Sequence, residues 1–96
     1  MVDGALLDTA NVLWAKRDWT SATNLYKGAI AIDESVYGPE NPEVAGDLVN
    51  YATLLRESGQ GTAAVRALRR ALAIYEAAFG PNSPQALQIR RDLGPP

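Results

Sequence analysis

Two stretches decide the fold of this chain: residues 37–42 read YGPENP and residues 79–84 read FGPNSP. They lie 42 residues apart and share an aromatic residue, a Gly-Pro pair and a second proline. The glycine suits the left-handed residue that ends a helix, and the proline after it prevents the helix from continuing. Asn41 and Ser83 stand where a helix cap is expected, each followed by a proline at the first helical position. Each stretch is therefore predicted to end one helix and begin the next.

The rest of the chain repeats with the same period of 42 residues. Identical residues recur at apolar and small positions, in the pairs Val2/Val44, Gly4/Gly46, Leu6/Leu48, Ala10/Ala52, Leu13/Leu55, Ala22/Ala64, Ala29/Ala71 and Ile32/Ile74. A fixed period of this length is typical of arrays in which one supersecondary unit stacks on the next. The chain is therefore expected to be built from helical repeats.

Helical periodicity within each repeat predicts five helices, over residues 2–16, 19–37, 42–58, 62–79 and 84–93. The apolar stripes expected to be buried are Ala22, Leu25, Tyr26, Ala29, Ile32 and Val36; Ala64, Ala67, Leu68, Ala71, Ile74 and Ala78; and Ala86, Leu87, Ile89 and Leu93. We predict one all-α domain over residues 1–96. It consists of repeat one (1–41), repeat two (42–83) and a half repeat (84–94) that caps the second repeat.

Composition excludes several classes of function. The chain has 96 residues, no histidine and no cysteine, so it lacks the usual general base, metal ligands and thiol chemistry. A net charge of −2 gives no general attraction to nucleic acid, and no apolar run is long enough for a membrane span. We expect a non-catalytic protein without metal, cofactor, nucleic-acid partner or membrane contact. The absence of a signal-peptide pattern favours a cytoplasmic location, and the excess of arginine over lysine favours a bacterial source.

These features resemble the tetratricopeptide repeat, specifically its 42-residue form found in kinesin light chains and many bacterial regulators. The residues that carry the resemblance, besides the two linkers, are Ala10, Leu13, Ala22, Tyr26 and Ala29, then Ala52, Leu55, Gly59, Ala64, Leu68 and Ala71. The resemblance covers nearly the whole chain. It implies antiparallel helix pairs stacked into a right-handed α-solenoid. It also implies a concave groove, lined by the first helix of each repeat, that binds a peptide or a helix of a protein partner.

The groove is expected on the side of the first helices opposite the small residues Ala10 and Ala52. The groove residues are then Leu7, Asp8, Asn11, Trp14, Val49, Asn50, Thr53, Arg56, Gln88 and Arg91. An asparagine amide offers donors and acceptors to a peptide backbone, and an exposed tryptophan is a favoured anchor. The alternatives are that Asn11, Asn50 and Arg56 are simply solvated, and that Trp14 packs under the following turn.

Two functions remain open. The first is a protein-interaction module that is a fragment of a longer repeat protein. The second is a structural repeat that forms homo-oligomers through its exposed ends. Residues 1–48 hold eight acids and three bases, whereas residues 49–96 hold three acids and six bases. This asymmetry favours head-to-tail contacts, unless it arises by chance in a short chain.

Overall fold

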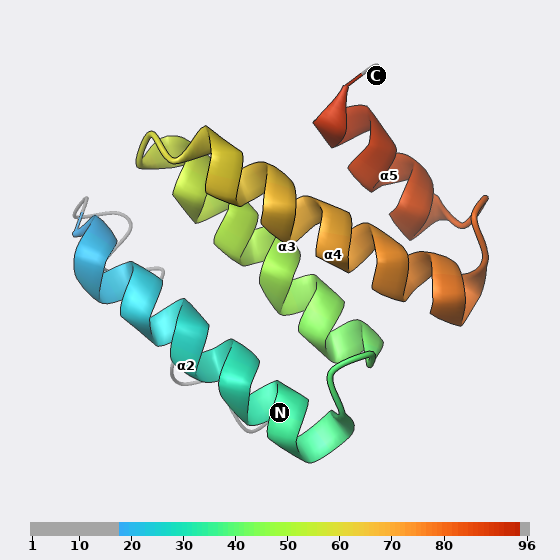
Figure 1. Ribbon diagram of the computed structural model, residues 1–96, viewed down its shortest axis with the longest axis horizontal. Coiled ribbons are helices and arrows are strands. Elements are labelled where there is room, and N and C mark those ends of the chain that lie inside the picture. The colour runs from blue at the N-terminus through green and yellow to red at the C-terminus, as the bar shows by residue number, and fades with distance from the viewer. Residues whose placement is uncertain (1–17, 95–96) are drawn as a thin grey trace.

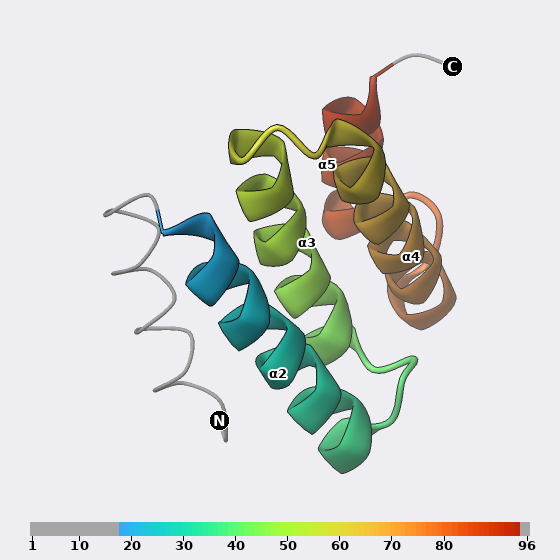
Figure 2. The same ribbon diagram turned by 60° about the vertical axis from the view of Figure 1, so that its left-hand side comes forward.

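The computed structural model describes residues 18–94, and the helix predicted over residues 2–16 lies outside them. The described part contains the helices α2 (Trp19–Tyr37), α3 (Pro42–Glu57), α4 (Gly61–Phe79) and α5 (Pro84–Leu93). Each helix packs against the next and runs in the opposite direction (Figures 1 and 2). The prediction of an all-helical repeat architecture is confirmed, with helix ends within one residue of the expected bounds. The right-handed twist and the domain bounds stay predictions.

The two Gly-Pro linkers end α2 and α4 with a backbone that differs from the expected left-handed helical residue. Gly38 and Gly80 have positive φ values of 92° and 94°, which glycine tolerates because it lacks a Cβ. Their ψ values of 152° and 159° are extended, because the proline that follows excludes helical ψ values. The N–H groups of these glycines still close the last turn, onto the carbonyls of Glu34 at 3.0 Å and Glu76 at 2.9 Å.

The predicted caps at the start of α3 and α5 are confirmed. The side chain of Asn41 accepts from the Glu43 N–H at 2.9 Å, and the Ser83 hydroxyl accepts from the Ala86 N–H at 3.2 Å. In both helices a proline follows the cap. Each linker therefore stops one helix and starts the next within a few residues, which makes the two helices antiparallel neighbours.

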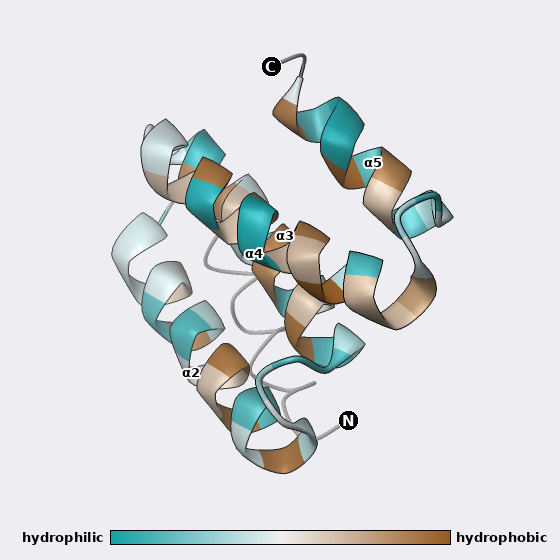
Figure 3. Cartoon of the chain, turned by 45° about the vertical axis from the view of Figure 1, so that its right-hand side comes forward, coloured by the Kyte–Doolittle hydropathy of each residue, from teal (hydrophilic) through white to brown (hydrophobic). Residues whose placement is uncertain are grey.

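The core is built from small residues at the helix contacts and larger residues between them. The alanines Ala22, Ala29, Ala45, Ala52, Ala64, Ala71 and Ala86 are at most 1% exposed. The largest fully buried side chains are Tyr26, Leu54, Leu55, Ile74, Ile89 and Val44. Figure 3 shows that each helix carries both hydrophobic and hydrophilic residues around its circumference. Small side chains at the contact points let helix axes approach closely, and the larger residues fill the space beside them.

Three residues expected in the apolar stripes lie outside the core. Val36 is 55% exposed, and Ala78, 42 residues later, is also exposed. Both lie in the last turn of their helices, beside a linker. Leu87 is 42% exposed, because it lies about 100° around the helix from its buried neighbour Ala86.

Arginine side chains hold both linkers in place. Arg70 forms an ion pair with Glu34 at 2.9 Å and donates to the carbonyl of Pro39 at 3.3 Å. Arg90 binds Glu76 and the carbonyl of Pro81 in the same way. The two glutamates and the two proline carbonyls are repeat equivalents, but the arginines come from α4 and α5. Arg70, expected in a wet basic cluster with Arg66 and Arg69, is therefore partly used in packing.

Candidate functional site

A groove runs between α3, the C-terminal half of α4, and α5. It consists of two adjoining hollows that share Gly46, Asn50, Tyr75 and Gln85. The first, of about 510 Å³, is also lined by Val49, Pro84, Gln88, Ile89 and Asp92. The second, of about 370 Å³, is also lined by Pro42, Glu43, Asp47 and Phe79. A continuous hollow of mixed apolar and polar character is the usual form of a binding site.

The lining of the groove by α3 follows from the burial of its opposite side. Leu48, Ala52 and Leu55 belong to the core shared with α4. The helical period then turns Gly46, Val49 and Asn50 to the other side, where Val49 is half-buried and Asn50 is exposed. This side of α3 is the one that the sequence pattern predicts to face the groove.

The floor between α3 and α5 comes from the aromatic residues of α4. The Tyr75 hydroxyl lies over Gly46, at 3.7 Å from the position that a Cβ would take there. The Tyr75 ring stacks on that of Phe79, with ring centroids 6.0 Å apart and planes at 23°. Phe79 remains 51% exposed, so one part of the ring pair is buried and another part is open to a ligand.

The groove is acidic in the described part of the chain. Glu43, Asp47 and Asp92 line it, and no lysine or arginine between residues 18 and 94 lines either hollow. Burial raises the pKa of the Tyr75 phenol, and the charges of Glu43 and then Asp47 raise this pKa further. The carboxylates are therefore close enough to the ring pair to act on it electrostatically.

Amide side chains supply most of the neutral polar groups of the groove. Asn50, Gln85 and Gln88 are all exposed, and Gln88 donates to Asp92 at 3.1 Å. Amides offer both donors and acceptors. Together with Val49 and Ile89, they suit an extended or helical polypeptide better than a small charged substrate.

The structure brings together some of the predicted groove residues and separates others. Val49, Asn50 and Gln88 line the first hollow. Thr53 and Arg56 are exposed on α3 but line neither hollow, and the Thr53 hydroxyl donates to the Val49 carbonyl at 3.2 Å. Arg91 lines a different surface of α5. The remaining predictions, which lie outside the described residues, are Leu7, Asp8, Asn11 and Trp14.

Sequence reasoning missed the aromatic floor of the groove. Tyr75 is the repeat equivalent of Asp33, so the internal repeat contained no signal for it. The spacing of four residues between Tyr75 and Phe79, with both side chains on one helix face, was a usable signal. Gly46 and Gln85 were missed because the groove was placed only opposite the small residues of the first helices.

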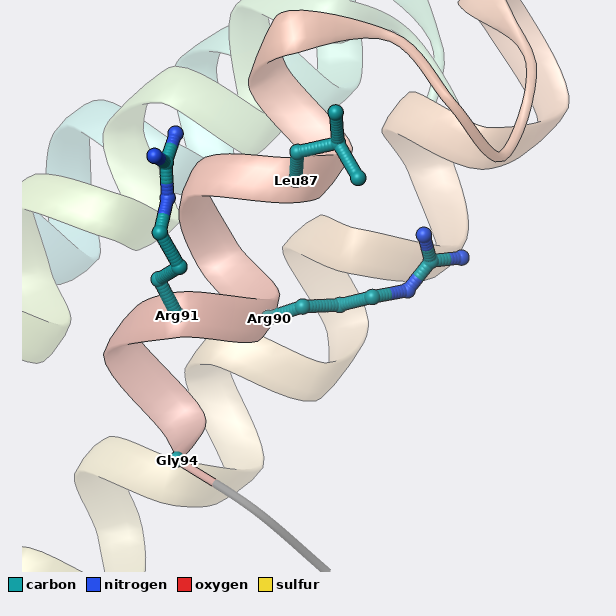
Figure 4. Close-up of a pocket in the computed structure, with 4 residues that line it drawn as sticks. All are labelled: Leu87, Arg90, Arg91 and Gly94. Carbon is teal, nitrogen blue, oxygen red and sulfur yellow. The ribbon is translucent and has the colours of Figure 1, made fainter.

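A separate hollow of about 560 Å³ lies on another side of α5 (Figure 4). It is lined by Leu87, Arg90, Arg91 and Gly94. Figure 4 shows Arg90 extending toward α4, in keeping with its ion pair to Glu76. Exposed Leu87 and Arg91 leave this surface with an apolar and a basic group.

Two further searches concern other kinds of site. Between residues 18 and 94, no group of three or more acidic, histidine or cysteine side chains is arranged to hold a metal ion. None of the helices in the same range has the length and apolar character needed to cross a membrane.

Comparison with known proteins gives one match. The family model described as Tetratricopeptide repeat matches residues 4–77 and again residues 47–94. No curated protein matches the chain. The two overlapping matches span most of the sequence, including both Gly-Pro linkers and all residues of the groove described above.

Proposed function

The chain belongs to the tetratricopeptide repeat family, and from this premise we propose that it binds a peptide or a helix of a protein partner in the groove between α3 and α5. Repeats of this family generally mediate protein–protein interaction and form a non-catalytic family. The kinesin-light-chain-like subtype and the cytoplasmic and bacterial assignments stay proposals that rest on sequence pattern alone.

The observation that carries the proposal is the combined lining of the groove. Val49, Ile89 and the Tyr75–Phe79 pair supply apolar surface, while Asn50 and Gln88 supply exposed amides beside it. Apolar burial gives affinity, and amides satisfy the backbone groups of the bound segment. The same groove holds no histidine or cysteine, because the chain has none, and this fits binding better than catalysis.

A blocking substitution tests the proposal. Gly46→Gln places a side chain inside the groove, while removal of a glycine from the middle of a helix favours helix formation. Gly28→Gln in α2 is the matched control, because a Cβ there meets nothing within 4 Å. We expect peptides selected from a random display library on the wild-type chain to bind the control and to lose at least about tenfold in affinity for Gly46→Gln.

The measurement is calorimetry of the selected peptides with each variant, together with circular dichroism to verify the fold. Equal affinity for both variants would place the binding site elsewhere. A library that yields no binding peptide would count against the proposed function as a whole.

The outer surface of α5 favours a second candidate function, self-assembly through repeat ends. Leu87 is 42% exposed beside Arg91 in the hollow of Figure 4, and the acidic residues of the chain are concentrated in residues 1–48. An apolar residue flanked by a basic one complements an acidic surface on another copy. This function predicts an oligomer that dissociates at high salt.

A further inference from the structure

We propose that the segment bound in the groove is cationic, and that an arginine side chain of the partner occupies the hollow between Glu43 and Phe79. The proposal rests on the proposed function of the groove and adds the chemistry of its ligand. The second hollow, beside Val49 and Ile89, then takes an apolar side chain of the same segment.

The first argument is the charge of the groove. Three carboxylates line it and no basic residue of the described part does. The arginines nearest to the linkers are already engaged, since Arg70 pairs with Glu34 and Arg90 with Glu76. The groove therefore has an uncompensated negative potential, which attracts a positive partner and repels an acidic one.

The second argument is the shape and chemistry of the hollow beside Phe79. The exposed part of the Phe79 ring offers an aromatic surface, and a guanidinium group stacks on such surfaces as well as being attracted by them. Glu43, Asn50 and Gln85 surround the ring with carboxylate and amide oxygens. These oxygens can accept the several N–H donors of a planar guanidinium.

The third argument is the burial of the supporting groups. Asp47 is only 4% exposed, and its charge raises the pKa of the Tyr75 phenol from below the ring pair. A charge in a buried position is screened less by solvent than one on the surface. Its attraction for a cation in the hollow is therefore stronger than that of an exposed carboxylate.

The experiment uses capped peptides derived from a sequence selected on the wild-type chain by random display. In each peptide the basic residues are kept, or replaced by citrulline, lysine or glutamate. Citrulline has the shape of arginine without its charge. We expect arginine to bind best, lysine more weakly, and citrulline and glutamate at least about tenfold more weakly than arginine. Raising the salt from about 0.05 M to about 0.5 M should weaken the arginine form most.

Variants of the chain locate the arginine. Glu43→Gln and Phe79→Ala should each weaken the arginine peptide by about tenfold and leave the citrulline peptide nearly unchanged. Arg69→Gln, an exposed change on α4 outside the groove, is the control and should have no such effect.

The outcomes separate this inference from the proposed function. If selection yields neutral or acidic peptides that Gly46→Gln still blocks, the groove binds a segment but the cationic ligand is wrong. If arginine peptides bind but ignore both Glu43→Gln and Phe79→Ala, the arginine subsite is wrong. If no peptide binds, both the proposed function and this inference are overturned.

Discussion

Single residues at equivalent repeat positions differ in what they do at the start of the long helices. Asp18 precedes α2, and its carboxylate accepts from the Ser21 N–H at 3.2 Å. Gln60 stands 42 residues later and precedes α4, but its side chain makes no capping hydrogen bond. The backbone angles are similar, with φ and ψ of −87° and 76° at Asp18 and −103° and 61° at Gln60. The second long helix therefore begins without a cap that its backbone can accept.

Gln60→Asp should restore this cap. We expect the free energy of unfolding to rise by about 1 kcal/mol, because the new carboxylate satisfies an N–H of the first turn and interacts favourably with the helix dipole. Urea denaturation followed by circular dichroism measures the change. Gln60→Ala is the control and should give no gain. A stability of Gln60→Asp equal to that of the control would show that the α4 terminus needs no cap.

The buried tyrosines predict how stability changes at alkaline pH. Burial raises the pKa of Tyr26, Tyr51 and Tyr75 above that of an exposed tyrosine. The folded chain thus holds these protons more tightly than the unfolded chain. Their stabilising contribution is complete below the unfolded pKa of about 10 and is lost as the pH rises through the higher folded values.

We therefore expect the free energy of unfolding to fall as the pH rises above about 10. Urea titrations at several alkaline pH values measure this slope. Tyr26→Phe, which preserves the buried ring, should reduce the slope. An identical slope in this variant would mean that the Tyr26 phenol does not contribute to the pH dependence.

At the scale of the helix, alanines set the distance between neighbouring elements. Ala71 in α4 is fully buried, whereas Ala73, two residues later on the same helix, is exposed. The same contrast occurs in α2, between Ala29 and Ala31. Helix propensity is equal at these positions, so their difference lies only in what the helix packs against.

Ala71→Arg should prevent folding, because a long charged side chain would enter a close helix contact and lose its hydration there. Ala73→Arg is the matched control on the same helix and should change the free energy of unfolding by less than about 0.5 kcal/mol. Circular dichroism and thermal unfolding compare the two. A cooperative transition at the wild-type temperature in Ala71→Arg would contradict the assignment of the α3–α4 contact.

At the scale of the whole molecule, the groove and the outer surface of α5 make different predictions about solution mass. Binding in the groove needs no second copy, whereas self-assembly places Leu87 and Arg91 against another chain. The groove lies between elements that already pack on one another, α3 on α4 and α4 on α5. We therefore expect the groove to be complete in a monomer.

Light scattering at low and high salt tests this expectation. We expect the monomer mass under both conditions. If a larger species forms at low salt, Leu87→Asp should dissociate it, since a carboxylate would replace the exposed apolar side chain. An oligomer sensitive to both salt and Leu87→Asp would favour the second candidate function over the first.

The amino-acid sequence by itself determined the helices and their ends. Punctuation by Gly38, Pro39, Asn41 and Pro42, and its recurrence 42 residues later, acts within a few residues of chain. Local chemistry of this kind does not depend on the rest of the molecule. The α2 and α5 bounds were therefore predictable to the residue, and the buried alanines followed from the helical period.

Only the tertiary structure decided which side chains meet between helices. Tyr75 and Asp33 are repeat equivalents, yet one lies half-buried in the groove and the other is fully buried. Arg70 and Arg90 capture equivalent linkers from different helices, and Arg91 lies away from the groove that its helix helps to form. The helical period gives the direction of a side chain around its own axis, but the partner it meets depends on the separation and crossing of whole helices.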